Sequence, residues 1–348
     1  MTTILRATLA ALAFTSTVWL AGPAAAADDF DACQNESGEQ AIAACTRAID
    51  SGQYSGRRLA MLLTNRCAEW PDKHENDKAI DDCSRALQID PTSAGAFSNR
   101  GHAYHDKGQY DRAIDDLNQA IRLSPNDADL FNNRGLAYGD DGQNDRAIQD
   151  YDQAVRLDPQ LADAFYNRGN AYRRKGQSDR AIDDFSQAIR LKPNYVPALN
   201  NRGLAYDAKG QNDRAIADFS QAIRFTPNDA DLFNNRGNAY RHKGQHDRAI
   251  EDLSQAIRLN PDDADLFSNR GLVYDAKGQT DRAIEDFSQA IRLNPKDAPA
   301  FYNRGKSWEG KRDLQRALAD FKTFAELAPS DPDGPKAIER VTKALSAR

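Results

Sequence analysis

Residues 97–125 read FSNRGHAYHDKGQYDRAIDDLNQAIRLSP, and a close copy of this stretch begins again 34 residues later. Its Asn-Arg-Gly triplet ends at Gly101, and the copy Asn65-Arg66-Cys67 keeps the same register with cysteine in place of glycine. The later copies end at Gly135, Gly169, Gly203, Gly237, Gly271 and Gly305. Eight units fill residues 60–331 of the 348. A fixed period of this length predicts a solenoid of stacked supersecondary units.

Each unit has the pattern of two helices separated by a turn. In residues 97–105, Phe97, Gly101 and Tyr104 are spaced three and four apart, which places them on one stripe of a helix. Gly108 is expected to end this helix, because glycine accepts the left-handed conformation that follows a helix C-terminus. Asp111 opens a second helix whose apolar stripe includes Ile114. Neither helix can bury its stripe alone, so the sequence predicts an all-α fold.

The same residues give the chain a resemblance to the tetratricopeptide repeat. The family pattern matches Phe165, Gly169, Tyr172, Ala181, Phe185, Ala188 and Pro193. This resemblance implies a right-handed α-solenoid of tandem 34-residue helix–turn–helix repeats. It also implies that the first helices line the concave side, where partner peptides bind.

One departure from the family pattern is regular. The family usually has leucine before the glycine, whereas this chain has arginine there in every unit. The arginines are Arg66, Arg100, Arg134, Arg168, Arg202, Arg236, Arg270 and Arg304. An equally regular row of second-helix aspartates comprises Asp82, Asp116, Asp150, Asp184, Asp218, Asp252, Asp286 and Asp320. We expect an Arg–Asp ladder within or between repeats; the alternative is two independent solvated rows.

The two ends of the chain differ from the repeats. Residues 1–27 are interpreted as a signal peptide, because Arg6 precedes an apolar stretch and Ala24-Ala25-Ala26 supplies small residues for cleavage. Residues 28–59 are predicted to form a partial repeat and a loop, and residues 332–348 a C-terminal capping helix. The mature protein is therefore expected to be periplasmic or secreted, with no integral membrane segment after cleavage.

All four cysteines lie in the first quarter of the chain, at Cys33, Cys45, Cys67 and Cys83. In an exported chain an even number indicates disulfides, and four cysteines allow three connectivities. Cys67 replaces the glycine at the helix crossing and Cys83 the aromatic residue expected near it. The preferred pairs are therefore Cys33–Cys45 and Cys67–Cys83, and the alternative is four buried thiols.

An asparagine lies two residues before each glycine, and before Cys67, on the first helix. The row comprises Asn65, Asn99, Asn133, Asn167, Asn201, Asn235, Asn269 and Asn303. It resembles the asparagine ladder of the O-linked N-acetylglucosamine transferase, whose amides hold an extended peptide by its backbone. The other interpretation is that these amides bond neighbouring helices and specify the packing of the repeats.

A second regularity on the same face has a period of two units. The residue after the glycine alternates between leucine and asparagine, in the order Leu136, Asn170, Leu204, Asn238 and Leu272. Three residues further on, the series is Gly139, Arg173, Asp207, Arg241 and Asp275. One interpretation is duplication of a repeat pair with ion pairs between adjacent repeats. The other is a groove with apolar pockets at the leucines and charged rims at Arg173 and Arg241.

The sequence offers little for other chemistry. It has no phosphate-binding glycine loop, nucleophile elbow or zinc-protease motif, so no catalytic residue and no cofactor is predicted. His102 and His105 lie three apart on one first helix but lack a clear third ligand, so no metal site is predicted. With 46 basic and 52 acidic residues the chain is acidic, which argues against a nucleic-acid surface.

These observations predict a non-enzymatic scaffold or adaptor that binds other proteins or extended peptides in the concave groove. The candidate binding residues are the asparagine ladder from Asn99 to Asn303, the leucines Leu136, Leu204 and Leu272, and the arginines Arg173 and Arg241. The alternative function is a non-catalytic subunit of an envelope enzyme or of a polysaccharide-export or assembly complex. A ligand or metal carrier is a third class.

Overall fold

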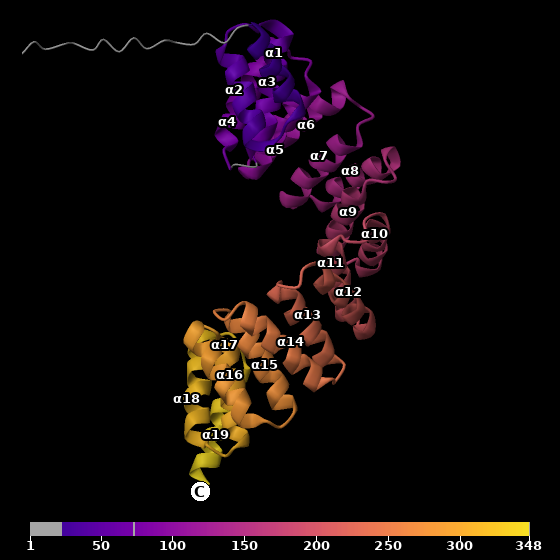
Figure 1. The fold of residues 1–348 in the computed structure, drawn as a ribbon. Helices are drawn as coiled ribbons and strands as arrows, with labels where there is room; N and C mark the ends of the chain where they lie inside the picture. Colours follow the sequence, from indigo (N-terminus) through magenta and orange to yellow (C-terminus); the bar gives the residue numbers. More distant parts are fainter. Residues whose placement is uncertain (1–22, 72–73, 348) are drawn as a thin grey trace, which may run out of the picture. The chain divides into compact units, whose positions relative to one another are not determined.

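The computed structural model describes residues 23–71 and 74–347, and it divides the chain into two compact units (Figure 1). Unit 1 comprises residues 1–142 and unit 2 residues 143–348. Over the described residues, the regular structure consists of 19 helices and no strands. The predicted all-α fold of tandem helix pairs is confirmed. No helix within the described ranges is both long and apolar enough to span a bilayer.

Unit 1 contains seven described helices. They are α1 (Pro23–Asn35), α2 (Gly38–Asp50), α3 (Gly56–Glu69), α4 (Asn76–Ile89), α5 (Ala94–Asp106), α6 (Tyr110–Leu123) and α7 (Ala128–Asp140). The two helices of each pair pack on each other, and the second helix of a pair also packs on the first helix of the next. Figure 1 shows α1 to α6 as one cluster of helices at the indigo and purple end of the described chain.

Unit 2 continues the same arrangement through twelve described helices. They are α8 (Asn144–Leu157), α9 (Ala162–Arg174), α10 (Ser178–Leu191), α11 (Val196–Ala208), α12 (Asn212–Phe225), α13 (Ala230–His242), α14 (His246–Leu259), α15 (Ala264–Ala276), α16 (Thr280–Leu293), α17 (Ala298–Gly310), α18 (Leu314–Leu327) and α19 (Asp333–Ser346). The final helix α19 packs on α18 and buries Ala337 and Val341. Its position agrees with the capping helix expected for residues 332–348.

The start of the chain adds a helix that the sequence did not indicate. The sequence predicted only a partial repeat and a loop in residues 28–59, whereas α1 and α2 form a complete helix pair there. Residues 1–22 of the predicted signal peptide lie outside the described residues. Residues 23–27 form the beginning of α1.

Local signals explain where the helices begin and end. The carboxylate of Asp127 accepts a hydrogen bond from the backbone N–H of Asp129 at 3.0 Å and caps α7, as its position before a first helix predicts. Asp229 caps α13 in the same way. Gly108 follows α5 with a φ of +69°, a conformation that glycine adopts without strain. The turn glycine recurs every 34 residues from Gly108 to Gly278, whereas Leu161 and Tyr195 replace the capping aspartate before α9 and α11.

Where the two helices of a repeat cross, glycine lets the backbones approach. A Cβ placed on Gly203 would lie 2.6 Å from Cε1 of Phe219, whose side chain is fully buried. Cys67 and Cys83 stand at the equivalent positions in an earlier repeat, and their sulfur atoms are 2.07 Å apart. The sulfurs of Cys33 and Cys45 are 2.04 Å apart. Both pairs lie at disulfide distance, in the pairing preferred from the sequence.

The arginine and aspartate rows face each other within repeats. In seven repeats the guanidinium makes two hydrogen bonds of 2.7–2.9 Å to the aspartate 16 residues later. The pairs are Arg66–Asp82, Arg100–Asp116, Arg168–Asp184, Arg202–Asp218, Arg236–Asp252, Arg270–Asp286 and Arg304–Asp320. Arg134 belongs to unit 1 and Asp150 to unit 2. The ladder hypothesis is confirmed for these seven pairs.

The close helix crossing yields the first testable prediction. Replacing Gly203 with alanine should lower the free energy of unfolding by about 1–3 kcal/mol, because the added methyl group has no room against Phe219. Gly310→Ala is the matched control, since nothing lies within 4 Å of a Cβ at that helical position. Urea denaturation would compare the two variants, and equal losses of stability would contradict this description of the crossing.

Candidate partner-binding face

The first helices of consecutive repeats form the candidate binding face. In unit 2, α9 contacts α11, α11 contacts α13, α13 contacts α15, and α15 contacts α17. The first helices of unit 2 thus stand next to one another along the stack, and the family resemblance implies that such a row lies on the concave side. We call the surface of α9, α11, α13 and α15 on this side the first-helix face.

The asparagine ladder bonds consecutive first helices together. Nδ2 of Asn235 donates to Oδ1 of Asn200 at 2.9 Å, and Asn269 donates to Asn234 at 2.9 Å. Asn201 donates instead to Asn170 at 2.8 Å. In each case the acceptor belongs to the first helix of the preceding repeat. The packing interpretation therefore holds for these three amides.

The rest of the ladder is less uniform. In unit 1, Asn99 donates to the backbone carbonyl of Thr64 at 3.3 Å, and Asn65 donates to that of Cys33 at 3.5 Å. The side chains of Asn133 and Asn303 make no hydrogen bond to another residue within the described ranges. Asn167 lies partly buried in α9. One sequence motif thus occurs in more than one bonding environment.

The packing bonds leave capacity for a ligand. Asn201, Asn235 and Asn269 are partly exposed, and in the described part of the chain no other group donates to their Oδ1 atoms. Each amide also has a second N–H. An asparagine amide has two donors and an acceptor oxygen with two lone pairs, so one bond to a neighbouring helix does not exhaust it. The packing role and a binding role are therefore compatible.

The alternating leucines provide apolar surface on the same side. Leu204 of α11 is 37% exposed, and Leu272 occupies the equivalent position of α15 and is half-buried. Leu136 of α7 is also half-buried and belongs to unit 1. Asn238 takes the leucine position in α13, so apolar and amide side chains alternate along unit 2.

The alternating charges do not pair as one interpretation predicted. Among Arg173, Asp207, Arg241 and Asp275, all of them described residues, no nitrogen and oxygen lie within 4.0 Å of each other. Asp207 instead accepts from Nδ1 of His242 at 3.0 Å. The predicted ion pairs between adjacent repeats are therefore not formed by these four side chains, and the carboxylate of Asp207 bonds the histidine beside Arg241 instead.

Arg241 is the most unusual charge on the face. Its guanidinium is half-buried, and burial lowers its pKa while the charge of Asp207 partly opposes that shift. Its hydrogen-bond partners are Oδ1 of Asn238 at 3.4 Å and Nε2 of His242 at 3.0 Å. In contrast, Arg173 is exposed. The sequence marked both arginines by position but gave no sign that their surroundings differ.

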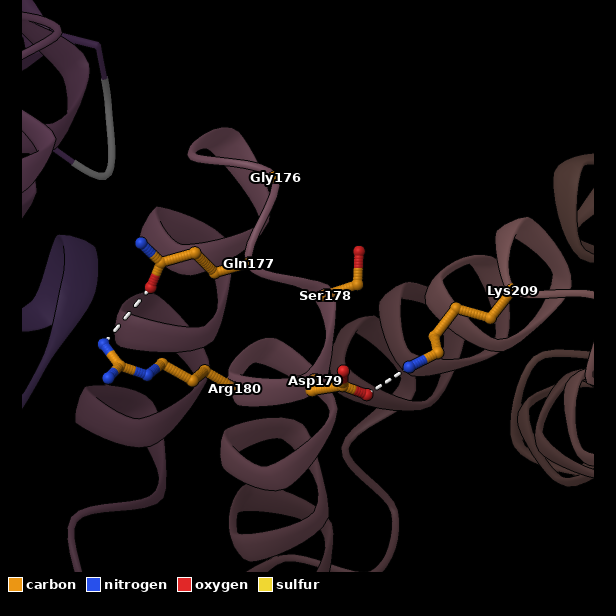
Figure 2. A pocket seen from close by; sticks show the side chains of 6 residues that line it. All are labelled: Gly176, Gln177, Ser178, Asp179, Arg180 and Lys209. Carbon is orange, nitrogen blue, oxygen red and sulfur yellow. Dashed lines mark hydrogen bonds and ion pairs between the residues drawn. The ribbon is translucent and has the colours of Figure 1, made fainter.

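A second regular feature was missed in the sequence. A pocket of about 610 Å³ lies at the turn between α9 and α10, lined by residues 176–180 and by Lys209 (Figure 2). Within it Lys209 pairs with Asp179, and Nη1 of Arg180 donates to Oε1 of Gln177 at 3.3 Å. Similar pockets lie at residues 210–214, 244–248 and 278–282. The recurring Lys-Gly-Gln-x-Asp-Arg hexapeptide is the signal that could have revealed them.

The turn pockets are best explained as part of the repeat architecture. Lys209 belongs to the repeat that follows Asp179, so each lysine–aspartate pair joins adjacent repeats. Equivalent pairs link Lys243 to Asp213 and Lys277 to Asp247. In the pocket of Figure 2 the acidic and basic groups already bond one another. The described residues also contain no cluster of three or more potential metal-ligating His, Cys, Asp or Glu side chains.

Family comparisons agree with the repeat architecture. A TPR repeat model matches residues 72–108, 101–142, 140–176, 205–241 and 237–278. A second tetratricopeptide repeat model matches residues 162–195 and 264–297. A third matches residues 185–217. The chain belongs to the tetratricopeptide repeat family. Repeats of this family are generally non-catalytic, and membership supports a role as a protein-interaction scaffold.

Solved structures show the same fold. The chain is similar to one in the crystal structure of the APC/C hetero-tetramer Cut9-Hcn1, at 18% identity and a TM-score of 0.55 over 91% of this chain and 62% of that one. A tetratricopeptide repeat protein from Parabacteroides merdae is similar at 20% identity and a TM-score of 0.51, over 72% of this chain and 99% of that one.

A further similarity is to YrrB, described as a TPR protein with an unusual peptide-binding site. The identity is 26% and the TM-score 0.48, over 53% of this chain and 95% of that one. The comparison with curated proteins gave no match.

The two bonding environments of the asparagine ladder can be separated experimentally. Asn235→Ala should be less stable than Asn303→Ala by about 0.5–1.5 kcal/mol, because Asn235 alone of the two donates to a neighbouring repeat. The change in helix propensity is the same in both variants and cancels in the comparison. Chemical denaturation would measure the difference. Variants of equal stability would show that the inter-repeat amide bond contributes nothing.

Proposed function

We propose that this protein is a non-catalytic scaffold that binds extended segments of partner proteins on the first-helix face. The observation that carries the proposal is the amide row of Asn201, Asn235 and Asn269, which is fixed by inter-repeat bonds yet retains donors and acceptors. Groups held in place before binding lose less entropy when a ligand arrives. The amides are therefore suited to recognise backbone.

An extended peptide matches the spacing of the row. Packed helices lie about 8–10 Å apart, and an extended chain advances about 3.3 Å per residue. About three peptide residues would therefore span one repeat. Each peptide backbone unit carries one N–H and one C=O, so an amide that can both donate and accept can bond it at every repeat. Recognition of this kind depends on the backbone and tolerates many side-chain sequences.

The leucines would add affinity that the amides alone cannot supply. A hydrogen bond to a peptide replaces one to water and contributes about 0.5–1.5 kcal/mol. Covering an exposed leucine side chain contributes about 1.5–3 kcal/mol if the burial is complete. Leu204 and Leu272 lie on α11 and α15, two repeats apart, with α13 between them. We infer that a partner segment places one apolar side chain against each leucine.

The compartment is part of the proposal. We infer export to the periplasm or beyond the cell, because residues 1–27 have the pattern of a signal peptide and two cysteine pairs lie at disulfide distance. Disulfides persist in oxidising compartments and are rare in reducing ones. Both pairs lie in unit 1, among the first two helix pairs.

The binding face can be tested with peptides that bind the mature chain, residues 28–348. These peptides would be selected from a random dodecapeptide display library with the mature chain as the target. The double variant Leu204→Ser and Leu272→Ser should weaken their binding at least tenfold, because two apolar contacts are lost. Fluorescence polarisation of the labelled peptides would give the dissociation constants.

The matched control removes exposed apolar side chains elsewhere in unit 2. Phe225 and Leu327 end the second helices α12 and α18 and are 47% and 39% exposed. The double variant Phe225→Ser and Leu327→Ser should bind the peptides as the wild type does. Loss of binding in this control, with normal binding in the Leu204 and Leu272 variant, would place the partner surface on the second helices and refute the proposal.

A further inference from the structure

Arg241 differs from the ladder arginines in how its charge is balanced. Seven ladder arginines, such as Arg236 on the same helix, each make two hydrogen bonds to a buried aspartate. Arg241 is half-buried as well, but no carboxylate of a described residue lies within 4.0 Å of it. A guanidinium removed from water without an anion is unfavourable. The first-helix face therefore keeps a half-buried positive charge that no carboxylate of a described residue contacts directly.

The neighbouring histidine accounts for this imbalance. His242 takes both oxygens of Asp207 at 3.0 Å, and this aspartate lies at the position of Arg241 one repeat earlier. Asp275 lies at the same position one repeat later, 3.4 Å from the hydroxyl oxygen of Ser307, which lies 3.1 Å from the backbone carbonyl oxygen of Asn303. Asp207 is thus engaged by another group, and no nitrogen of Arg241 lies within 4.0 Å of Asp275, which is also a described residue. Nη2 of Arg241 contacts Nε2 of His242 and does not reach a carboxylate.

The position of Arg241 relative to the leucines defines a pattern. Arg241 lies on α13, between Leu204 on α11 and Leu272 on α15. It stands one helical turn beyond Asn238, which occupies the leucine position of α13. With about three extended residues per repeat, a ligand side chain at Arg241 would be three residues from each side chain at the two leucines.

We propose that the first-helix face selects partner segments with one acidic side chain flanked, three residues away on each side, by apolar side chains. This inference rests on the proposed function and assigns the chemistry of the partner. Arginine binds a carboxylate through two parallel hydrogen bonds, which a neutral side chain cannot reproduce. The apolar side chains cover Leu204 and Leu272.

The same geometry excludes a uniformly acidic partner. Asp207 and Asp275 flank Arg241 on the adjacent helices, so acidic side chains at the neighbouring repeats would meet like charge. A single acidic residue within about six positions therefore fits the face better than an acidic run. This repulsion gives specificity in addition to the attraction at Arg241.

Selection from the same dodecapeptide library on three proteins tests the inference. On the wild type, the enriched peptides should contain Asp or Glu spaced three residues from apolar residues on both sides. Arg241→Glu should enrich Lys or Arg at the central position instead. Arg224→Glu is the matched control, because it makes the same charge change on the exposed side of α12, and it should enrich the wild-type pattern.

Dissociation constants of synthetic peptides then measure how much the acidic side chain contributes to binding. Replacing the central Glu of a selected peptide with Gln should weaken binding to the wild type at least tenfold, and the same replacement should have little effect on Arg241→Gln. A hexaglutamate peptide should not compete. Melting curves would show whether the Arg241 variants are folded. If Arg241→Glu is unfolded, the comparison between the wild type and Arg241→Gln tests the inference.

The outcomes separate this inference from the proposed function. Peptides that require Leu204 and Leu272 but show no preference for an acidic residue would overturn the acidic-partner inference alone. Peptides that bind independently of both leucines would overturn the proposed function. An unchanged preference in Arg241→Glu would also overturn the inference, since it would show that Arg241 does not contact the ligand.

Discussion

The arginine–aspartate pair is the interaction on which the rest of the repeat depends. In the repeat of α11 and α12, Nε and Nη2 of Arg202 bond the two oxygens of Asp218 at 2.8 and 2.7 Å. Nη1 bonds Oγ of Ser186 on α10 at 3.0 Å. A single side chain thus joins its own second helix to the second helix of the preceding repeat. The side chains are 18% and 7% exposed, so the geometry must offset a large desolvation cost.

In the seven repeats where it is described, this pair orients the first helix against the second helices, and four of these first helices form the candidate binding face. Arginine lies directly after the ladder asparagine in the sequence, so a guanidinium anchored between second helices holds the asparagine at the junction with the preceding first helix. Repetition of this arrangement places leucine, asparagine and Arg241 at equivalent positions in successive helices. Between the repeats of α8 and α10, Asp152 takes the place of the serine, so Arg168 bonds both Asp152 and Asp184. Burial is the main cause that raises the pKa of Asp184, and the nearby charge of Asp152 adds to it.

Much of this arrangement follows from spacing along the chain. The 34-residue period predicted the helix pairs, and the regular rows predicted that Arg202 and Asp218 would meet. The pairing of Cys67 with Cys83 could be anticipated because these residues replace the glycine and the aromatic side chain that meet at the crossing. In each case both partners belong to one repeat, where helix periodicity alone determines which faces touch.

Features that depend on the distance between repeats could not be predicted in this way. The sequence left open whether Asn235 packs or binds, and it gave no sign that His242 would take Asp207. The lysine–aspartate pairs at the turns were also missed, because Lys209 and Asp179 belong to different repeats. Helix α1 was missed because its alanine-rich start has the composition of a signal-peptide cleavage region.

A double-mutant cycle on Arg202 and Asp218 is the most direct test of this account. Arg202→Leu, which restores the usual residue of the family, and Asp218→Asn should each lower the free energy of unfolding by about 3 kcal/mol, because each leaves a buried partner unsatisfied. Urea denaturation of both single variants and the double variant would measure their coupling. The account predicts that the double variant loses at least about 1 kcal/mol less than the sum of the two single losses. Losses that add to within about 0.5 kcal/mol would show that the pair does not hold the repeat together.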